Sequence, residues 1–258
     1  MKKAVDFGEP TKLVGLEGSG GGCPGPRLES KIAVAPARPR HACALLALVV
    51  TALTLGAGPV STVRVDNWDA YPIGPLDLSA MWRRYAEERT TFKRPPAIVQ
   101  DDGRPVLQLM TDGEAMRIGR TLKIDPKKTP WLVWEWKPLV LPAGGDVRDP
   151  KRNDQAGRVM VVFKGMKGIQ YVWDTTAPVG TEVRPDELEL FQRALIVVRS
   201  GSRDLRQWSR ERRNVSEDYR RVFGEAPRPI KLVGVESHSN DTGSRTSMLF
   251  GTLRFEGR

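Results

Sequence analysis

From Val63 onward, hydrophobic and polar residues alternate with a period of two, in runs that are separated by clusters of proline and glycine. This alternation is typical of half-buried β-strands joined by turns. The pattern predicts strands over residues 63–67, 98–100, 105–110, 115–124, 131–139, 158–164, 168–173, 193–199, 207–215, 230–237 and 246–255. Because so many strands exceed what one open twisted sheet usually holds, the chain is predicted to be all-β, as a two-sheet antiparallel β-sandwich.

One segment has the pattern of a helix instead. Residues 216–224 place Tyr219 and Phe223 four positions apart on one helical face, with acidic residues in the first turn. Ser216 is the predicted N-cap and Gly224 the predicted stop. We expect this short helix to cover one edge of the sandwich.

The first sixty residues have a different composition from the rest. Residues 1–40 are rich in glycine and proline and poor in aromatic residues, which predicts a disordered leader. An uncharged run over 42–57 follows Arg38 and Arg40, and this arrangement indicates an export signal. Residues 41–60 are therefore predicted to be a signal peptide or an N-terminal membrane anchor. Either would place a single sandwich domain, residues 61–258, in the periplasm or outside the cell.

The cysteine content and the net charge restrict the kinds of site and of binding partner that the predicted domain can have. Both cysteines, Cys23 and Cys43, precede the predicted domain, so that domain has neither a disulfide nor a thiolate metal site. The chain has a net charge of +10, and the body without residues 1–58 keeps +7, because that segment holds seven basic and four acidic residues. The basic residues are dispersed, so we expect no nucleic-acid partner. A glycan or another cell-envelope component fits this charge better.

A series of short motifs runs along the body in a characteristic order. It comprises Trp134-Glu-Trp136, Asp154, Arg158 to Phe163, Tyr171-Val-Trp173, Pro178-Val-Gly180, Val198 to Gly201, Trp208, Glu211, Arg213, Asp218-Tyr219, Phe223-Gly-Glu225, Asp241-Thr-Gly243, Phe250-Gly251 and Phe255. Over residues 76–256 this order resembles the bacterial family of exported proteins called domain of unknown function 3047. The resemblance implies a jelly-roll sandwich similar to carbohydrate-binding modules, and it implies no particular activity.

Strand alternation suggests a binding face. Trp134 and Trp136 share a face with Leu132 and are predicted to lie in the core. Arg158 beside a strand that contains Tyr171 and Trp173 would form a polar, stacking surface suited to a sugar ring. The more frequent arrangement would bury both aromatic residues in the core and pair Arg158 with Asp154, and both readings stay open.

The loop over residues 236–243 is the most polar stretch before the last strand. Its His238 and Asp241 join Arg158, Tyr171, Trp173 and Asp154 as candidate ligand-binding residues, although a lone surface histidine more often has no chemical role. In the family that the chain resembles, acidic residues stand where this chain has His238, Asn240 and Thr252. Neutral groups at these positions predict that no calcium ion is bound, and no metal or other cofactor is expected.

The body lacks the residue sets of common enzymes. It has no cysteine and one histidine, no Gly-x-Ser-x-Gly turn and no phosphate-binding loop. A glycosidase could still use two carboxylates, but Glu182, Glu187 and Glu189 surround a predicted loop. The sequence therefore favours an exported, non-catalytic protein that binds a carbohydrate or another envelope ligand. A glycan-cleaving enzyme and a structural, partner-binding domain are the alternatives.

Overall fold

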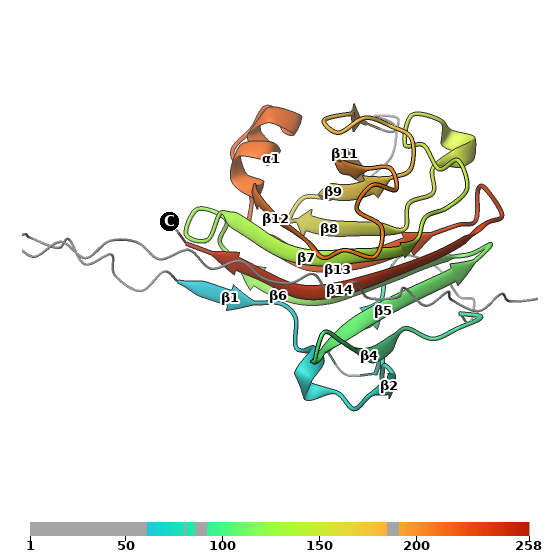
Figure 1. Ribbon diagram of the computed structural model, residues 1–258. Helices are drawn as coiled ribbons and strands as arrows, with labels where there is room; N and C mark the ends of the chain where they lie inside the picture. The colour runs from blue at the N-terminus through green and yellow to red at the C-terminus, as the bar shows by residue number, and fades with distance from the viewer. Residues whose placement is uncertain (1–60, 80, 86–91, 185–190, 258) are drawn as a thin grey trace, which may run out of the picture. The chain divides into compact units, whose positions relative to one another are not determined.

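The computed structural model describes residues 61–79, 81–85, 92–184 and 191–257 (Figure 1). In these residues the chain folds into two β-sheets that enclose one hydrophobic core, with one α-helix at an end of the sandwich. The predicted all-β, two-sheet sandwich with one short helix is thus confirmed. The predicted leader over 1–40 and the predicted signal or anchor over 41–60 lie outside the described residues, and the limits of the domain remain a prediction.

The first sheet, sheet A, has the strand order β12-β7-β14-β5-β4-β2, and β1 pairs with β14 as well. Its strands are β1 (Thr62–Arg64), β2 (Gly74–Pro75), β4 (Ala97–Asp101), β5 (Arg104–Asp112), β7 (Trp131–Val140), β12 (Ser209–Asn214) and β14 (Arg245–Glu256). All its pairs are antiparallel.

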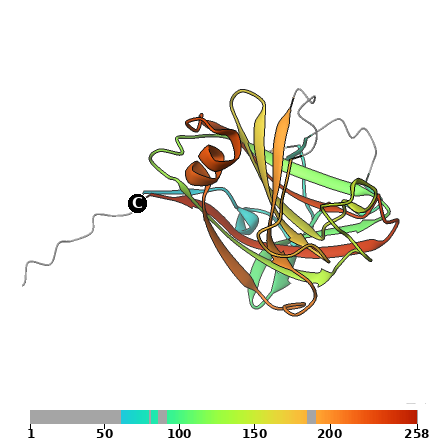
Figure 2. The ribbon, with the colours of Figure 1, turned by 90° about the horizontal axis from the view of Figure 1, so that it is seen from above.

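The second sheet, sheet B, has the order β10-β11-β9-β8-β13-β6-β3. Its strands are β3 (Arg83–Arg84), β6 (Ala115–Ile124), β8 (Gly157–Phe163), β9 (Lys167–Asp174), β10 (Glu182–Val183), β11 (Gln192–Ser200) and β13 (Ile230–His238). Seen from above, β9 and β11, in yellow and orange, run across the red strand β14 of the other sheet (Figure 2).

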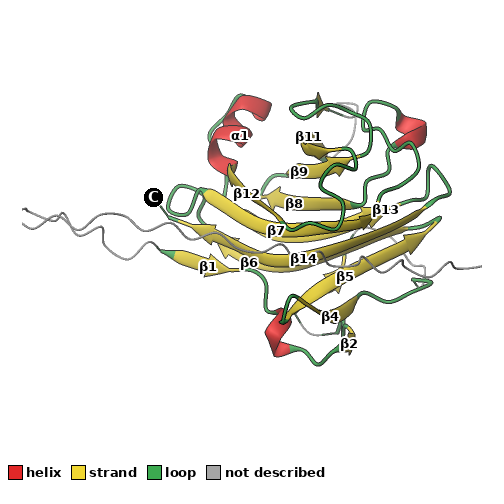
Figure 3. Ribbon diagram, viewed as in Figure 1, coloured by secondary structure: helices red, strands yellow, loops and turns green. Residues whose placement is uncertain are grey.

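Every strand predicted from alternation is present. The ends differ from the predicted ones by at most two residues, except that β1 ends at Arg64, three residues before the predicted end. The three strands that the pattern missed, β2, β3 and β10, are two residues long, which is too short for a period of two to appear. Two single-turn 3-10 helices, Trp68–Ala70 and Pro150–Arg152, lie in the connections (Figure 3).

One strand pair departs from the predicted antiparallel arrangement. Strand β11 runs parallel to β9, with Ala194 beside Ile169. Parallel neighbours need a long crossover connection, and residues 175–191 supply it. On its way the chain forms β10, which pairs antiparallel with the outer edge of β11.

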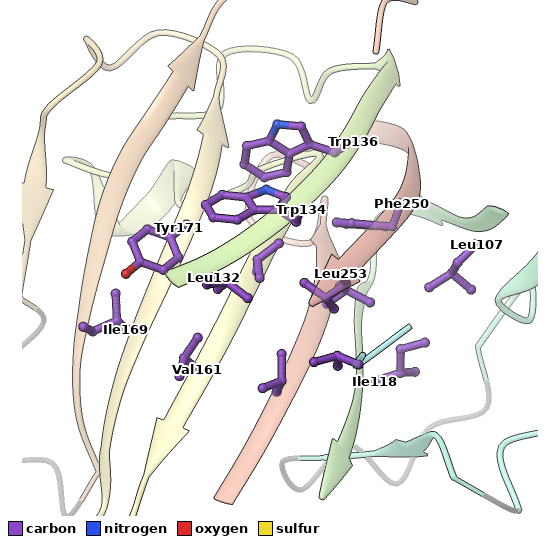
Figure 4. Close-up of a cluster of buried hydrophobic side chains, with 14 of the residues drawn as sticks. Leu107, Ile118, Leu132, Trp134, Trp136, Val161, Ile169, Tyr171, Phe250 and Leu253 are labelled. Carbon is purple, nitrogen blue, oxygen red and sulfur yellow. The ribbon is translucent and has the colours of Figure 1, made fainter. Parts of the chain in front are cut away.

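The core is built on aromatic contacts between the sheets. Trp134 of β7 stacks on Tyr171 of β9 with ring centroids 5.2 Å apart, and Trp136 meets Trp173 edge to face at 5.6 Å. Figure 4 shows Trp134 and Trp136 side by side on β7, with Tyr171 next to Trp134. The predicted inward face of β7 is therefore confirmed, since Leu132 and both tryptophans are buried.

The helix α1, Val215–Phe223, begins one residue earlier than predicted. Its N-cap is Asn214, whose side-chain oxygen accepts hydrogen bonds from the backbone N–H groups of Ser216 and Glu217 at 3.1 and 3.2 Å. The predicted cap, Ser216, instead donates its hydroxyl to the buried carbonyl of Pro126 at 2.5 Å. Gly224 ends the helix in the left-handed conformation, as predicted.

The helix closes one end of the core through its apolar side. Tyr219 packs against Phe163 of β8 with ring centroids 4.5 Å apart, and Val215 and Val222 are buried with it. In the part of the chain that the structure describes, no helix has the length and apolar character that crossing a bilayer requires.

Candidate functional site

A row of charged residues crosses the outer face of sheet B. In the strand register, Glu236 of β13 lies directly opposite Arg117 of β6 on one side and Arg158 of β8 on the other. Because side chains alternate along a strand, Val233 and Val235 point into the core and Glu236 points away from it. The register thus places a carboxylate between two guanidinium groups on three adjacent strands.

Glu236 is fully buried and its carboxylate is surrounded by donors. Gln170 Nε2 donates to its two oxygens at 2.9 and 3.0 Å, and His238 Nε2 lies 3.0 Å from Oε2. The Tyr85 hydroxyl donates to Oε1. We call Tyr85, Arg117, Arg158, Gln170, Glu236 and His238 the Glu236 cluster.

The position of Tyr85 depends on two glycines that face each other across β6 and β13. A Cβ atom on Gly234 would come within 2.5 Å of the Tyr85 ring, and one on Gly119 within 2.8 Å. No side chain larger than hydrogen fits beneath the ring. The two glycines therefore allow Tyr85 to lie across the sheet and reach Glu236.

The charges of the cluster follow from burial and from one another. Burial acts to raise the pKa of Glu236, but the hydrogen bond from His238 and then the positive charge of Arg158 hold it below the ordinary value. Burial, and then the charge of Arg158, lower the pKa of His238 to about 3. At neutral pH the carboxylate is thus ionised and the imidazole is neutral.

Beside the cluster lies an open cavity of about 530 Å³. Its walls are Arg117, Val147, Arg148, Pro150, Asn153, Arg158, Val183, Arg184, Arg193, His238, Asn240 and Asp241. Polar side chains thus outnumber apolar ones, and the volume falls in the range of small-molecule sites. We call this cavity the arginine pocket.

The structure contradicts the predicted stacking surface. Tyr171 and Trp173 are completely buried, and they lie on the inner face of β9 against Trp134 and Trp136. Across the strand pair Tyr171 faces Val159 and not Arg158, whose neighbour is Val172. Arg158 and the two aromatic residues therefore lie on opposite faces of the sheet, and among the described residues no phenylalanine, tyrosine or tryptophan lines the arginine pocket.

Arg158 and Asp154 do not form the predicted pair either. Arg158 donates through Nη2 to the backbone and side-chain oxygens of Asn153, at 2.5 and 3.2 Å. Its Nη1 lies 3.9 Å from Glu236. Asp154 accepts both the backbone N–H and the hydroxyl of Thr242 at 2.7 Å, so it holds the loop between β13 and β14.

The other two predicted residues meet in the arginine pocket. His238 is only 3% exposed, at the end of β13, so the prediction of a surface histidine was wrong. Asp241 is exposed at the rim and accepts a hydrogen bond from Asn240. Burial, and then the nearby Asp154, raise the pKa of Asp241.

Sequence reasoning missed Glu236, Arg117, Gln170, Tyr85 and Arg193. A signal for three of them was present, because each interrupts an apolar strand with a polar or charged residue: Arg117, Gln170 and Glu236. Buried charges occur where they are paired, so charged residues on neighbouring apolar strands point to a cluster.

The positions that suggested a lost calcium site do not come together. His238 lies on sheet B, whereas Thr252 lies on β14 of sheet A and bonds to Glu135. Within the described part of the chain, no three histidine, cysteine or acidic side chains gather closely enough to hold a metal ion.

Sheet A carries a second polar surface around Trp208, but its groups are already committed. The indole N–H donates to Asp101 at 2.7 Å, and Lys137 bonds the same carboxylate at 2.8 Å. Arg104 lies over the ring at 4.6 Å while it pairs with Glu135. These contacts tie the loop before β12 to sheet A, so the arginine pocket is the stronger candidate site.

Comparison with solved structures finds sandwiches of low identity. The xyloglucanase domain of NopAA, a type three effector from Sinorhizobium fredii, is 9% identical, with a TM-score of 0.43 over 78% of this chain and 100% of that chain. The family 30 carbohydrate-binding module of a cellulosomal cellulase of Clostridium thermocellum is also 9% identical, with a TM-score of 0.35 over 76% and 96%.

No curated protein matches the sequence significantly. The family model described as protein of unknown function (DUF3047) matches residues 81–254, which include the Glu236 cluster and every wall of the arginine pocket. The resemblance seen in the sequence is therefore confirmed: the chain belongs to the DUF3047 family.

Proposed function

We propose that this protein is an exported, non-catalytic β-sandwich that binds a carbohydrate in the arginine pocket. The observation that supports this most directly is the pocket itself, a cavity of about 530 Å³ in which arginine, asparagine, aspartate and histidine side chains converge. Sugars carry neighbouring hydroxyl groups that both donate and accept hydrogen bonds, and these side chains offer both kinds of partner.

Binding here would rest on hydrogen bonds, without an aromatic platform. Among the buried polar atoms of the Glu236 cluster, Arg158 Nε and Gln170 Oε1 are two that have no hydrogen-bond partner among the described residues. An unpaired buried donor or acceptor is costly, so such atoms are expected at sites where a ligand or water completes the network. Arg158 is also a wall of the pocket, which brings its donor to a ligand.

A glycan array tests this proposal with the full-length chain. We expect binding to a limited set of glycans, with no shortened product detected by mass spectrometry afterwards. Asn240→Trp should abolish binding, because Asn240 is exposed at the pocket and a large ring there would fill it. Gln207→Trp is the matched control. Gln207 is exposed and lies just before β12, the edge strand of sheet A.

Three results would contradict the proposal in different ways. Glycan binding that Asn240→Trp leaves intact would move the site elsewhere. Cleaved products would favour the alternative of a glycan-cleaving enzyme. No glycan binding, together with a stable protein complex recovered by cross-linking, would favour a structural, partner-binding domain.

Export is part of the same proposal and needs its own test. The uncharged run over 42–57 follows Arg38 and Arg40, as in segments that carry a chain across a membrane. Fusing residues 1–61 to a reporter that is active only outside the cytoplasm should give a signal, and Leu46→Arg with Leu48→Arg should abolish it. An unchanged signal in that variant would contradict export through this segment.

A further inference from the structure

The walls of the arginine pocket are unusually rich in positive charge. Five arginines line it, and Asp241 is the single acidic side chain among the described lining residues. They come from three strands and two loops of sheet B: Arg117, Arg148, Arg158, Arg184 and Arg193. The carboxylate of Glu236, which faces Arg117 and Arg158, is fully buried and is not one of the walls.

Two of the five arginines bond to carboxylates close by in the sequence. Arg148 bonds Asp146 through two nitrogens, the shorter contact being 2.6 Å. Arg184 bonds Glu182 at 2.9 Å. These pairs are local, since each joins residues two apart in sequence, and both arginines are exposed.

Glu236 balances the charge of the two arginines of the Glu236 cluster from a short distance. Arg117 Nε and Arg158 Nη1 lie 3.7 and 3.9 Å from Glu236 Oε2, beyond hydrogen-bond distance. The carboxylate's two oxygens already accept hydrogen bonds from Tyr85 and Gln170, and His238 Nε2 lies 3.0 Å from Oε2. Glu236 therefore holds both guanidinium groups in place without using their donors.

Arg158 is the clearest case of an available donor. Its side chain is 3% exposed, it lines the pocket, and its Nε has no hydrogen-bond partner among the described residues. Burial lowers the pKa of Arg158 to about 10, and Arg117 and Arg193 act in the same direction against the attraction of Glu236. Positive charges crowd one another here, and a bound anion would relieve that crowding.

We propose that the arginine pocket recognises the carboxylate of an acidic sugar, with Arg158 as the central donor and Arg117 and Arg193 beside it. This inference rests on the proposed function and adds the class of sugar. A guanidinium donates charge-assisted hydrogen bonds to a carboxylate, and these are shorter and stronger than hydrogen bonds to neutral hydroxyls. His238, neutral at neutral pH, and Asn240 remain to bond the ring hydroxyls.

The test is a calorimetric titration of the full-length chain with oligosaccharides of galacturonic, glucuronic and mannuronic acid. Each is compared with its own methyl ester, which keeps the sugar and removes the charge. We expect at least one acid to bind roughly tenfold or more tightly than its ester. Binding of that acid should weaken as sodium chloride is raised, because salt screens the attraction.

Variants assign the effect to the pocket. Arg158→Gln should lower the affinity for the acid by about tenfold or more and leave that for the ester nearly unchanged. Because Arg158 is buried, Arg148→Gln at the exposed rim serves as a second variant, with a smaller loss in the same direction. Arg210→Gln makes the same charge change on sheet A, where Arg210 is exposed on β12, and should have no effect.

The outcomes separate this inference from the proposed function. Neutral glycans that bind as well as the acids, and are lost in Asn240→Trp, would overturn the acidic-sugar inference and leave carbohydrate binding standing. Saturable binding of a simple dicarboxylate such as tartrate, lost in Arg158→Gln, without binding of any glycan would keep the anion site and overturn carbohydrate binding. Equal loss in Arg210→Gln would show a general charge effect and overturn the site.

Discussion

At the scale of single residues, the Glu236 cluster shows how a polar group can lie inside an apolar sheet. Glu236 is completely buried, yet Gln170 and Tyr85 donate hydrogen bonds to it, His238 Nε2 lies 3.0 Å from it, and two arginines balance its charge. Removing any one partner would leave a buried charge incompletely satisfied, which is more costly than the original pair is stabilising. The cluster should therefore be sensitive to protonation.

His238 gives this sensitivity a definite direction. Its pKa is lowered to about 3 in the folded chain, so between pH 3 and the ordinary value of 6.5 the unfolded chain binds more protons. The free energy of unfolding should then be highest, as far as His238 determines it, above about pH 6.5. It should fall as the pH decreases below that value.

Urea unfolding at pH 7 and pH 5.5 measures this effect. The native chain should lose about 1 kcal/mol of unfolding free energy between the two values, because a neutral buried histidine must compete with protonation in the unfolded chain. His238→Gln should lose much less over the same interval. An equal loss in both chains would show that another group causes it.

At the scale of elements, the sequence predicted the positions of the strands better than it predicted which side of each strand faces the core. Alternation located all the longer strands, and on β7 it distinguished the inward Trp134 and Trp136 from the outward Glu135. On β8 and β9 it could not, because nearly every residue of both strands is buried on either face. Where both faces are covered, a period of two no longer distinguishes core from surface.

The prediction of the first residue of the helix was wrong for a related reason. Ser216 and Asn214 are both good N-caps, and only the tertiary contact of the Ser216 hydroxyl with Pro126 decides between them. The Glu236 cluster was missed because its members are far apart in sequence. Their positions become neighbours only through the strand order β9-β8-β13-β6.

The prediction for helix α1 therefore concerns its N-cap, Asn214. Asn214→Ala should lower the free energy of unfolding by about 1 kcal/mol, since two backbone N–H groups lose their acceptor. Asn214→Ser, which keeps a capping oxygen, should recover most of that loss. Urea melts in which alanine and serine behave alike would contradict the cap.

At the scale of the whole molecule, the core between the sheets depends on tryptophans from both. Trp134→Ala and Trp173→Ala should each cost about 3–5 kcal/mol in urea unfolding, because each removes a buried ring that packs across the sandwich. Val179→Ala, at an exposed position, is the control and should change little. If Trp173→Ala lowered the free energy of unfolding as little as the control does, the placement of Trp173 in the core would be contradicted.

The two faces of the molecule differ in what they offer a ligand. The outer face of sheet A is occupied by internal pairs such as Arg104 with Glu135. In the arginine pocket on sheet B, by contrast, Arg158 Nε has no hydrogen-bond partner among the described residues. A ligand should accordingly protect one face and leave the other unchanged.

Hydrogen exchange of the full-length chain, with and without a concentrated mixture of neutral and acidic oligosaccharides, measures this directly. Binding in the arginine pocket predicts slower exchange of backbone amides over 147–158 and 236–241, lost in Asn240→Trp, with β7 and β12 unaffected. Protection confined to β7 and β12, or no protection anywhere, would contradict a carbohydrate site on sheet B.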